Sequence, residues 1–176
     1  MQIILISGKA ENGKSTVAFM VKSILESKGK RVLKIAYADL VKYVCKQYFE
    51  WDGQKDIVGR SILQRVGTDI VRAKNPNYWV DFVINFVKLF EDDYEFVVID
   101  DARFGSELTR WDRDGWDTFS VRVTREGHIS SLTPEQLLHS SECALDDYNF
   151  DYYITSKDEV GLGIEVDKFI EYMEVR

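Results

Sequence analysis

The feature that most constrains this chain is a glycine-rich loop close to its N-terminus. Residues Gly8 to Ser15 have the sequence GKAENGKS and match the pattern G-x-x-x-x-G-K-[ST] at every fixed position. An apolar run from Ile3 to Ile6 precedes the loop, and apolar residues follow it with helical spacing from Val17 to Leu25. A glycine-rich turn that occurred by chance would not need an apolar strand before it and a helix after it. We therefore predict a phosphate-binding P-loop between a strand and a helix.

The spacing of this loop has a physical reason. Glycines let the backbone close around a phosphate, so that its N–H groups and the N-terminus of the following helix point at the anion. Lys14 would reach the β- and γ-phosphates of a nucleotide, and Ser15 is placed to bind Mg²⁺. Nucleotide phosphate binding is therefore the first function that the sequence predicts.

Composition places the chain among ordinary soluble globular proteins, with a length that suits one domain over residues 1–176. The net charge of −7 argues against a nucleic-acid polymer as a partner, because such binding needs a basic face. No apolar run approaches the ~20 residues of a membrane span, and no signal peptide is evident. We expect no membrane partner, a cytoplasmic location, and reduced thiols at Cys45 and Cys143.

Strand and helix signals alternate along the chain. The expected strands are 3–6, 31–37, 96–99, 118–123 and 152–155, and the expected helices are 17–25, 40–49, 59–73, 77–90, 105–114 and 163–174. This alternation predicts an α/β fold with a mainly parallel sheet and helices on both faces. The helical insert at about 38–92 and the polar excursion at about 125–148 stand where a P-loop kinase carries its acceptor-binding region and its lid.

Acidic residues follow two of the expected strands. Asp100 and Asp101 come directly after the apolar run Phe96 to Ile99, in the form of a Walker B element. A carboxylate there holds Mg²⁺ directly, holds it through water, or orients a substrate hydroxyl. Asp39 follows the second expected strand, where it either caps the next helix or faces a ligand at the edge of the sheet.

Four segments carry a more specific pattern than the topology does. They are the P-loop; Leu63 to Asp69 with Arg72 and Tyr78 to Val80; Asp101 to Phe104 with Glu107; and His139 to Glu142 followed by Asp151. Together they resemble the bacteriophage deoxynucleoside monophosphate kinase family, within the P-loop nucleoside monophosphate kinase group. The resemblance spans nearly the whole chain, and Asp101 matches the family's aspartate where Asp100 does not. It implies a P-loop NTPase fold of the nucleoside monophosphate kinase type, with an acceptor-binding helical insert and a lid.

This resemblance implies MgATP-dependent transfer of the γ-phosphoryl group to a (deoxy)nucleoside monophosphate, giving the diphosphate. ATP and Mg²⁺ are then the cofactors, small nucleotides are the partners, and a homodimer is left open. The residues implied at the ATP phosphates are Gly8, Ala10, Glu11, Asn12, Gly13, Lys14, Ser15 and Thr16. The residues implied in catalysis are Lys14, Asp101, Arg103 and Arg125, and those implied at Mg²⁺ are Ser15 and Asp101.

The residues assigned to the acceptor are Asp39, Arg65, Arg72, Trp79, Asp101 and Arg103. Arg65 and Arg72 lie seven positions apart, which in an α-helix puts them on one face, although a solvated basic face has the same spacing. Arg103 either meets the substrate or pairs with Glu107. Trp79 either stacks on a base or belongs to the core.

The excursion at about 125–148 has few candidate residues. Arg125 opens it, and either approaches the transferring phosphoryl group when the lid closes or remains a surface arginine. His139 with Glu142 would shape the same segment. A metal site is not indicated, because the two histidines of the chain, His128 and His139, share no helical register.

Two other functions stay open. A P-loop kinase for another small phosphorylated acceptor, such as phosphomevalonate, would keep the fold and change the acceptor-side arginines. A non-catalytic nucleotide-binding module should have lost a phosphate-site residue, whereas Lys14 and Ser15 are both present. A GTPase is not indicated, because the chain has no Asn-Lys-x-Asp element. The sequence does not select the base or the sugar of an acceptor nucleotide.

Overall fold

The computed structural model describes residues 1–176, with every side chain except those of residues 113 and 114. Its centre is a five-stranded sheet formed by β1 (Gln2–Ser7), β2 (Val32–Ile35), β3 (Phe96–Ala102), β4 (Asp117–Arg125) and β5 (Tyr152–Ser156). The strand order is β2-β3-β1-β4-β5, and every pairing is parallel. The parallel sheet predicted from the alternation of elements is therefore confirmed.

The central strands β1 and β3 are apolar on both faces. Residues Ile3 to Ile6 are completely buried, and Ile3, Ile4 and Leu5 pair in register with residues 97–99 of β3. A continuous apolar run of this kind suits a strand that is covered on both sides. One core cluster accordingly lies on each face of the sheet.

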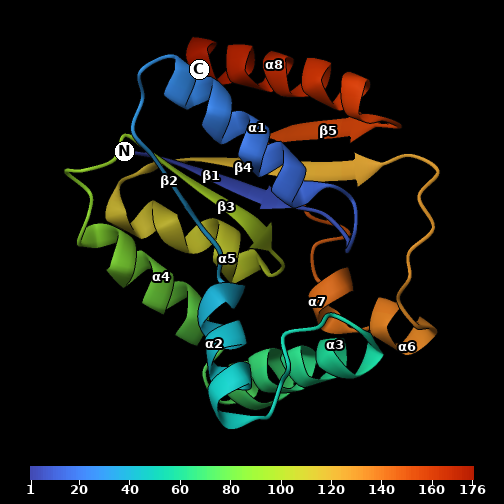
Figure 1. Cartoon of the computed structure of the whole chain (residues 1–176). Helices are drawn as coiled ribbons and strands as arrows, with labels where there is room; N and C mark the ends of the chain where they lie inside the picture. The colour runs from blue at the N-terminus through green and yellow to red at the C-terminus, as the bar shows by residue number, and fades with distance from the viewer.

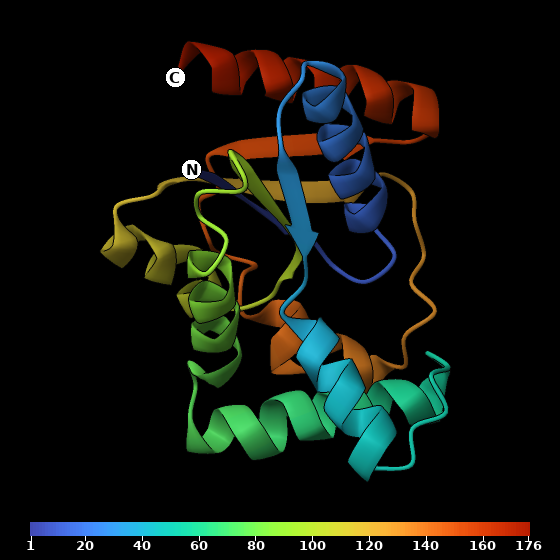
Figure 2. The same ribbon diagram turned by 60° about the vertical axis from the view of Figure 1, so that its left-hand side comes forward.

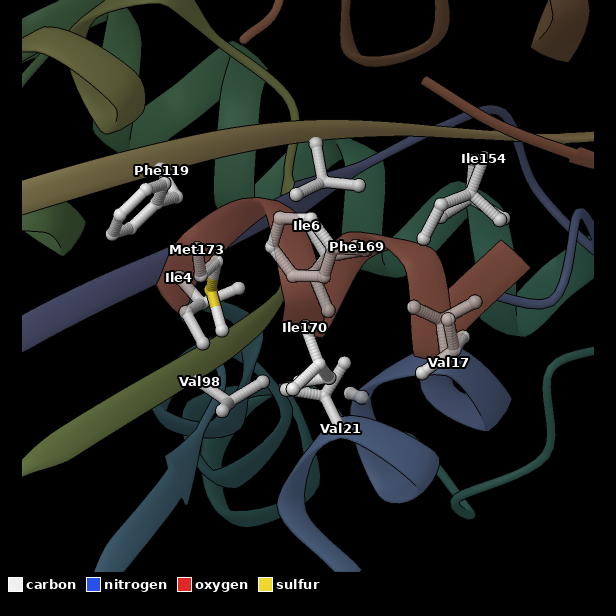
Figure 3. Close-up of a cluster of buried hydrophobic side chains, with 14 of the residues drawn as sticks. Ile4, Ile6, Val17, Val21, Val98, Phe119, Ile154, Phe169, Ile170 and Met173 are labelled. Carbon is white, nitrogen blue, oxygen red and sulfur yellow. The ribbon is translucent and has the colours of Figure 1, made fainter. Parts of the chain in front are cut away.

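The first cluster lies between the sheet and two helices, α1 (Lys14–Ser27) and α8 (Glu159–Val175). Both helices cover the same face of the sheet in Figure 1. Figure 3 shows Phe169 and Ile170 of α8 gathered with Ile6 of β1 and Val21 of α1. This packing anchors the start of α1, and with it the P-loop, against the sheet.

The opposite face is covered by α4 (Tyr78–Lys88), α5 (Gly105–Thr109) and the 3₁₀ turn η2 (Arg110–Asp114) (Figure 1). The buried indole of Trp111 donates its N–H to the Tyr37 hydroxyl over 2.8 Å. That hydroxyl in turn donates to the backbone carbonyl of Glu107 over 2.7 Å. These two bonds hold the end of β2 close to the segment that follows β3.

A further helical layer lies beyond the carboxyl ends of the strands. It contains α2 (Ala38–Tyr48), α3 (Ile57–Gln64) and the π-helix η1 (Arg65–Arg72), and Figure 2 shows β2 pointing towards it. The layer has a small core of its own, formed by Val41, Cys45, Trp51, Val66 and Trp79. The Asp56 carboxylate caps α3 by accepting the backbone N–H of Gly59 over 2.7 Å.

The polar segment between β4 and β5 folds back over this edge of the sheet. It contains two one-turn helices, α6 (Pro134–Leu137) and α7 (Ser140–Cys143). Figures 1 and 2 both place α7 between the sheet and α3. The side-chain amide of Gln136 donates to the backbone carbonyl of Ile57 over 3.3 Å. The segment therefore contacts the helical layer.

Two of the differences from the expected elements affect candidate site residues. β3 runs to Ala102 instead of ending at Ile99, because its pairing with β1 continues that far, so Asp100 and Asp101 lie inside the strand. The expected helix 59–73 is α-helical only to Gln64 and continues as the π-helix η1. In the described part of the chain, no helix combines the length and the hydropathy needed to span a membrane.

Candidate active site

The P-loop crosses from β1 to α1 with glycines in backbone conformations that other residues rarely adopt. Gly8 has a φ of 147°, and a Cβ atom there would lie 2.4 Å from the carbonyl oxygen of Val123. Gly13 has a φ of 88° and is the N-cap residue of α1. The conformation of the loop therefore requires glycine at both positions.

The N-terminus of α1 is open to an anion. Among the described side chains, none caps this end of the helix, and its first turn holds no acidic residue. Ser15 and Thr16 are exposed there. The first N–H groups of a helix have no internal partner and carry the positive end of the helix dipole. The residues of the loop therefore fit a bound phosphate.

Lys14 is the buried cation of this loop, with only 9% of its surface exposed. Its Nζ donates to the backbone carbonyl of Lys9 over 2.7 Å. Burial lowers the pKa of Lys14 to about 7, the nearby Arg103 charge adds to this effect, and the Glu142 carboxylate opposes it. A bound phosphate would give the ammonium group a full countercharge.

An open cleft lies beside the P-loop, between the edge of the sheet and the helical layer. Cationic side chains line it together with aromatic rings and with the acidic residues Asp101, Glu107 and Glu142. The cations are Lys55, Arg60, Arg72 and Arg103, and the aromatic residues are Tyr37, Trp79 and Phe104. This lining suits a small ligand that has an anionic group and an apolar ring.

Asp101 lines the cleft, whereas Asp100 does not. The carboxylate oxygens of Asp101 accept the backbone N–H groups of Tyr37 and Ala38 over 2.9 and 2.8 Å. Asp101 thus caps the N-terminus of α2 from the neighbouring strand. Burial raises the pKa of Asp101, and these two hydrogen bonds oppose the shift. Asp100 is buried and pairs with Lys34 of β2 over 3.0 Å.

Two of the residues predicted for the acceptor make structural contacts. Asp39 lies outside the cleft; its carboxylate accepts the backbone N–H of Ala36 over 3.2 Å and pairs with Lys42 over 2.7 Å. Trp79 borders the cleft, but it is only 2% exposed and donates its indole N–H to the carbonyl of Gly67 over 2.8 Å. Asp39 therefore serves the start of α2, and Trp79 belongs mainly to the small core.

Arg103 follows β3 and enters the cleft. Its Nη1 donates to Oε1 of Glu142 over 2.5 Å and to the backbone carbonyl of Ser141 over 3.2 Å. Glu107, the partner considered from the sequence, instead accepts the backbone N–H of Arg103 over 2.6 Å. The guanidinium group is therefore held by α7, while the backbone is held by α5.

Arg72 is oriented by three contacts, one of which is the hydrogen bond from its Nη1 to the backbone carbonyl of Pro76 over 3.3 Å. Its guanidinium pairs with the Glu107 carboxylate and lies 4.2 Å from the centre of the Phe104 ring. Glu107 is 1% exposed, and burial raises its pKa while the Arg72 charge lowers it. Glu107 thus connects Arg72 with the backbone of the segment after β3.

The expected common face of Arg65 and Arg72 is wrong. Arg72 lines the cleft, whereas Arg65 is exposed and lies outside it. The other lining residues of this stretch are Arg60, Leu63, Gln64, Gly67 and Thr68. Arg65 and Arg72 are the first and last residues of the π-helix, whose hydrogen bonds span five residues instead of four. Seven positions there make fewer than two full turns, so the two arginines diverge.

A second hollow borders the other side of the P-loop. Its lining includes Asn12, Gly13 and Thr16, residues 156–159 after β5, and Arg125 at the end of β4. The backbone N–H of Arg125 donates to the side-chain carbonyl of Asn12 over 2.8 Å. Arg125 therefore stands beside the start of α1 and outside the lining of the first cleft.

Sequence reasoning missed Arg60 and Lys55 in the cleft. Arg60 donates to the Glu11 carboxylate at the tip of the P-loop over 2.8 Å. Hydrogen bonds from Ser131 lower the pKa of Glu11 to about 2. In the sequence, Arg60 could be recognised only as a charged residue one helical turn before Gln64. A charged residue at such a position usually lies on a solvated surface.

No family model matches this chain, and no curated protein matches its sequence. Solved structures do match. The Mycobacterium tuberculosis APS kinase CysC in complex with AMPPNP and APS has a TM-score of 0.52 at 16% identity, over 98% of this chain and 97% of that one. A mutant of the same enzyme has a TM-score of 0.50 at 16% identity, over 98% and 96%. Shikimate kinase from Bacteroides thetaiotaomicron has a TM-score of 0.49 at 12% identity, over 99% and 98%.

The likeness to the APS kinase structures extends over almost the full length of both chains. Together with the sheet order and the P-loop at the end of β1, it shows the fold of P-loop kinases. The predicted fold class is therefore confirmed. An identity of 16% shows the fold alone, so the reaction has to be argued from the site.

Proposed function

We propose that this chain is an ATP-dependent kinase that transfers the γ-phosphoryl group of ATP to a (deoxy)nucleoside monophosphate, giving the diphosphate. The observation that carries the proposal is the junction of two sites, a phosphate loop at an open helix N-terminus and a cleft of arginines and aromatic rings beside it. Phosphoryl transfer depends on positioning and charge neutralisation, which such residues supply. The resemblance of the sequence motifs to the phage kinase family supports the choice of acceptor.

On the donor side, the backbone N–H groups of residues 8–16 are proposed to bind the ATP phosphates. Lys14 would exchange the Lys9 carbonyl for phosphate oxygens and neutralise their charge. The second hollow would take the rest of the nucleotide, with Arg125 in its wall. Residues 125–148 are the proposed lid, and closure of such a segment would bring Arg125 towards the transferring group.

Ser15 and Asp101 are the proposed Mg²⁺ ligands. The Ser15 side chain lies at the exposed start of α1, as a ligand beside the phosphates should. Both oxygens of Asp101 already accept backbone N–H groups, so Asp101 would act through a bound water. When bound, Mg²⁺ would neutralise charge on the phosphate oxygens.

On the acceptor side, Arg72 and Arg103 are the proposed ligands of the acceptor phosphate, and Arg103, which borders the P-loop as well as the cleft, is also proposed to meet the transferring γ-phosphoryl group. Arg72 is already oriented by Glu107, and Arg103 by α7. The region at about 38–92 supplies the further cation Arg60 and the Trp79 wall of the cleft. Asp39 and Arg65 lie outside the cleft and are left out of this proposal.

The test is a coupled assay of ADP release with MgATP and a panel of deoxynucleoside monophosphates, ribonucleoside monophosphates and phosphomevalonate. We expect turnover with one or a few nucleotides, and a fall of about 100-fold or more in kcat for Lys14→Ala, because the charge opposite the transferring group is lost. Lys46→Ala, a change at an exposed lysine of α2, is the matched control and should leave turnover intact.

The other outcomes have defined meanings. Turnover with phosphomevalonate alone would keep the kinase function and replace the acceptor. Tight nucleotide binding without acceptor-dependent turnover would favour a non-catalytic nucleotide-binding module.

A further inference from the structure

Glu142 has no role in the transfer described above, although it lies where the P-loop meets the cleft. Its side chain is only 6% exposed. Oε2 accepts the backbone N–H of Ala10 over 2.9 Å, and Oε1 accepts Nη1 of Arg103 over 2.5 Å. A single carboxylate from α7 therefore bridges the phosphate loop and the arginine beside it.

This placement needs an explanation other than stability. A buried ion pair contributes little more to folding than an apolar pair of similar volume, because both charges lose their hydration. A negative charge next to a phosphate loop also repels the phosphates. The arrangement is better explained by its effect on the conformation of Arg103.

The contacts of Arg103 show what that effect is. Both acceptors of its guanidinium group, Glu142 and the Ser141 carbonyl, belong to α7 and bind the same Nη1. In the described structure, its Nε and Nη2 make no hydrogen bond. The planar guanidinium donates in fixed directions, so anchoring one corner also sets the direction of the remaining donors.

We propose that Glu142 is a positioning residue that holds Arg103 so that its remaining donors meet the transferring γ-phosphoryl group. The inference rests on the proposed kinase function. A small hollow supports the location, because Arg103 and Glu142 line it together with Ser7 and Gly8 at the start of the P-loop. Arg103 thus borders the loop itself as well as the cleft.

Calorimetry tests this inference through nucleotide binding, which needs no catalytic turnover. AMPPNP carries a γ-phosphoryl group and ADP does not, so the ratio of the ADP Kd to the AMPPNP Kd measures recognition of that group. Glu142→Gln should lower the ratio about tenfold, the value of one charge-assisted hydrogen bond. The same change added to Arg103→Ala should lower it no further, because the two residues act as one unit. Glu135→Gln, at an exposed position of α6, should leave the ratio unchanged.

Kinetics provide the second measurement. Glu142→Gln should lower kcat about tenfold, and the lost kcat should be partly restored by Glu142→Asp. An unchanged AMPPNP to ADP ratio in Glu142→Gln would overturn the inference. An equal fall of the ratio with and without the Arg103 side chain would also overturn it.

Three further outcomes separate this inference from the proposed function. Tighter AMPPNP binding in Glu142→Gln would make Glu142 a competitor for the phosphate loop and overturn its positioning role. A wild-type chain without acceptor-dependent turnover, but with the expected ratio changes, would refute the proposed reaction and leave the positioning role standing. Failure of the wild type to bind AMPPNP would overturn both.

Discussion

The P-loop lysine should lower the stability of the folded chain, and the size of this effect follows from its environment. The pKa of Lys14 falls from 10.5 to about 7 on folding, mainly because the ammonium group is buried. A pKa difference of one between the folded and unfolded chain corresponds to about 1.4 kcal/mol, so the charged form costs the folded state up to about 5 kcal/mol. Lys14→Met keeps the length of the side chain and removes the charge. At pH 6 we expect it to stabilise the chain by several kcal/mol.

The pH dependence separates this effect from better packing. Between about pH 7 and pH 10.5 the unfolded chain holds the Lys14 proton and the folded chain does not, so the stability of the wild type rises with pH. The difference in the free energy of unfolding between the wild type and Lys14→Met should therefore shrink by about 3 kcal/mol between pH 7 and pH 9.5. Urea unfolding of both proteins at several pH values measures this difference, with Lys46→Met on the exposed face of α2 as the control. A difference that does not change with pH would refute the reasoning.

Three further substitutions test the loop, the buried network and the core. Gly8→Ala should abolish AMPPNP binding in calorimetry, because its Cβ has no space at a φ of 147°, whereas Gly105→Ala meets no neighbouring atom and should bind normally. Glu107→Gln should lower the free energy of unfolding by about 3 kcal/mol, because it removes the countercharge of the Arg72 side chain, which is only 12% exposed. A loss near zero in a denaturant titration would contradict this. Phe169→Ala should cost about 3–5 kcal/mol in the same measurement, and Phe19→Ala, at a side chain 66% exposed, about 0.5 kcal/mol or less.

The fold was predictable because its signals are local. The P-loop pattern, the apolar run of β1 and the helical spacing in α1 lie within one stretch of the chain, and each needs only its neighbours to be recognised. The run Phe96 to Ile99 likewise predicted a strand that is buried on both faces. Alternating elements then leave few arrangements other than a parallel sheet covered by helices.

The acceptor side was less predictable because helical geometry was assumed there. Residues 65–72 are compatible with an ordinary amphipathic α-helix, and nothing in their pattern indicates hydrogen bonds that span five residues. The change of period moves Arg65 out of the cleft and leaves Arg72 inside it. A sequence-based assignment of two arginines to one face therefore depended on a backbone geometry that only the tertiary fold selects.

The contacts around the P-loop could not be predicted from the sequence, for a different reason. Among the contacts of Glu11, Ala10 and Lys9 are those with Arg60, Glu142 and Asp146, which lie 49, 132 and 137 positions away. The segment that carries the last two is polar and shows no periodicity, so its side chains give the same signal as a solvated loop. Such contacts exist only after β4 and β5 have joined the sheet.

These distant contacts change what the P-loop motif means for function. A local motif predicts that the chain can bend around a phosphate, but polar contacts from the insert and from residues 126–148 hold the loop in its observed shape. Rearrangement of either region must therefore alter the loop, and a phosphate bound in the loop must alter both regions, because linkage is reciprocal. On the proposed function, donor binding and acceptor binding are thus expected to be energetically coupled, with Glu142 as a direct connection between Ala10 and Arg103.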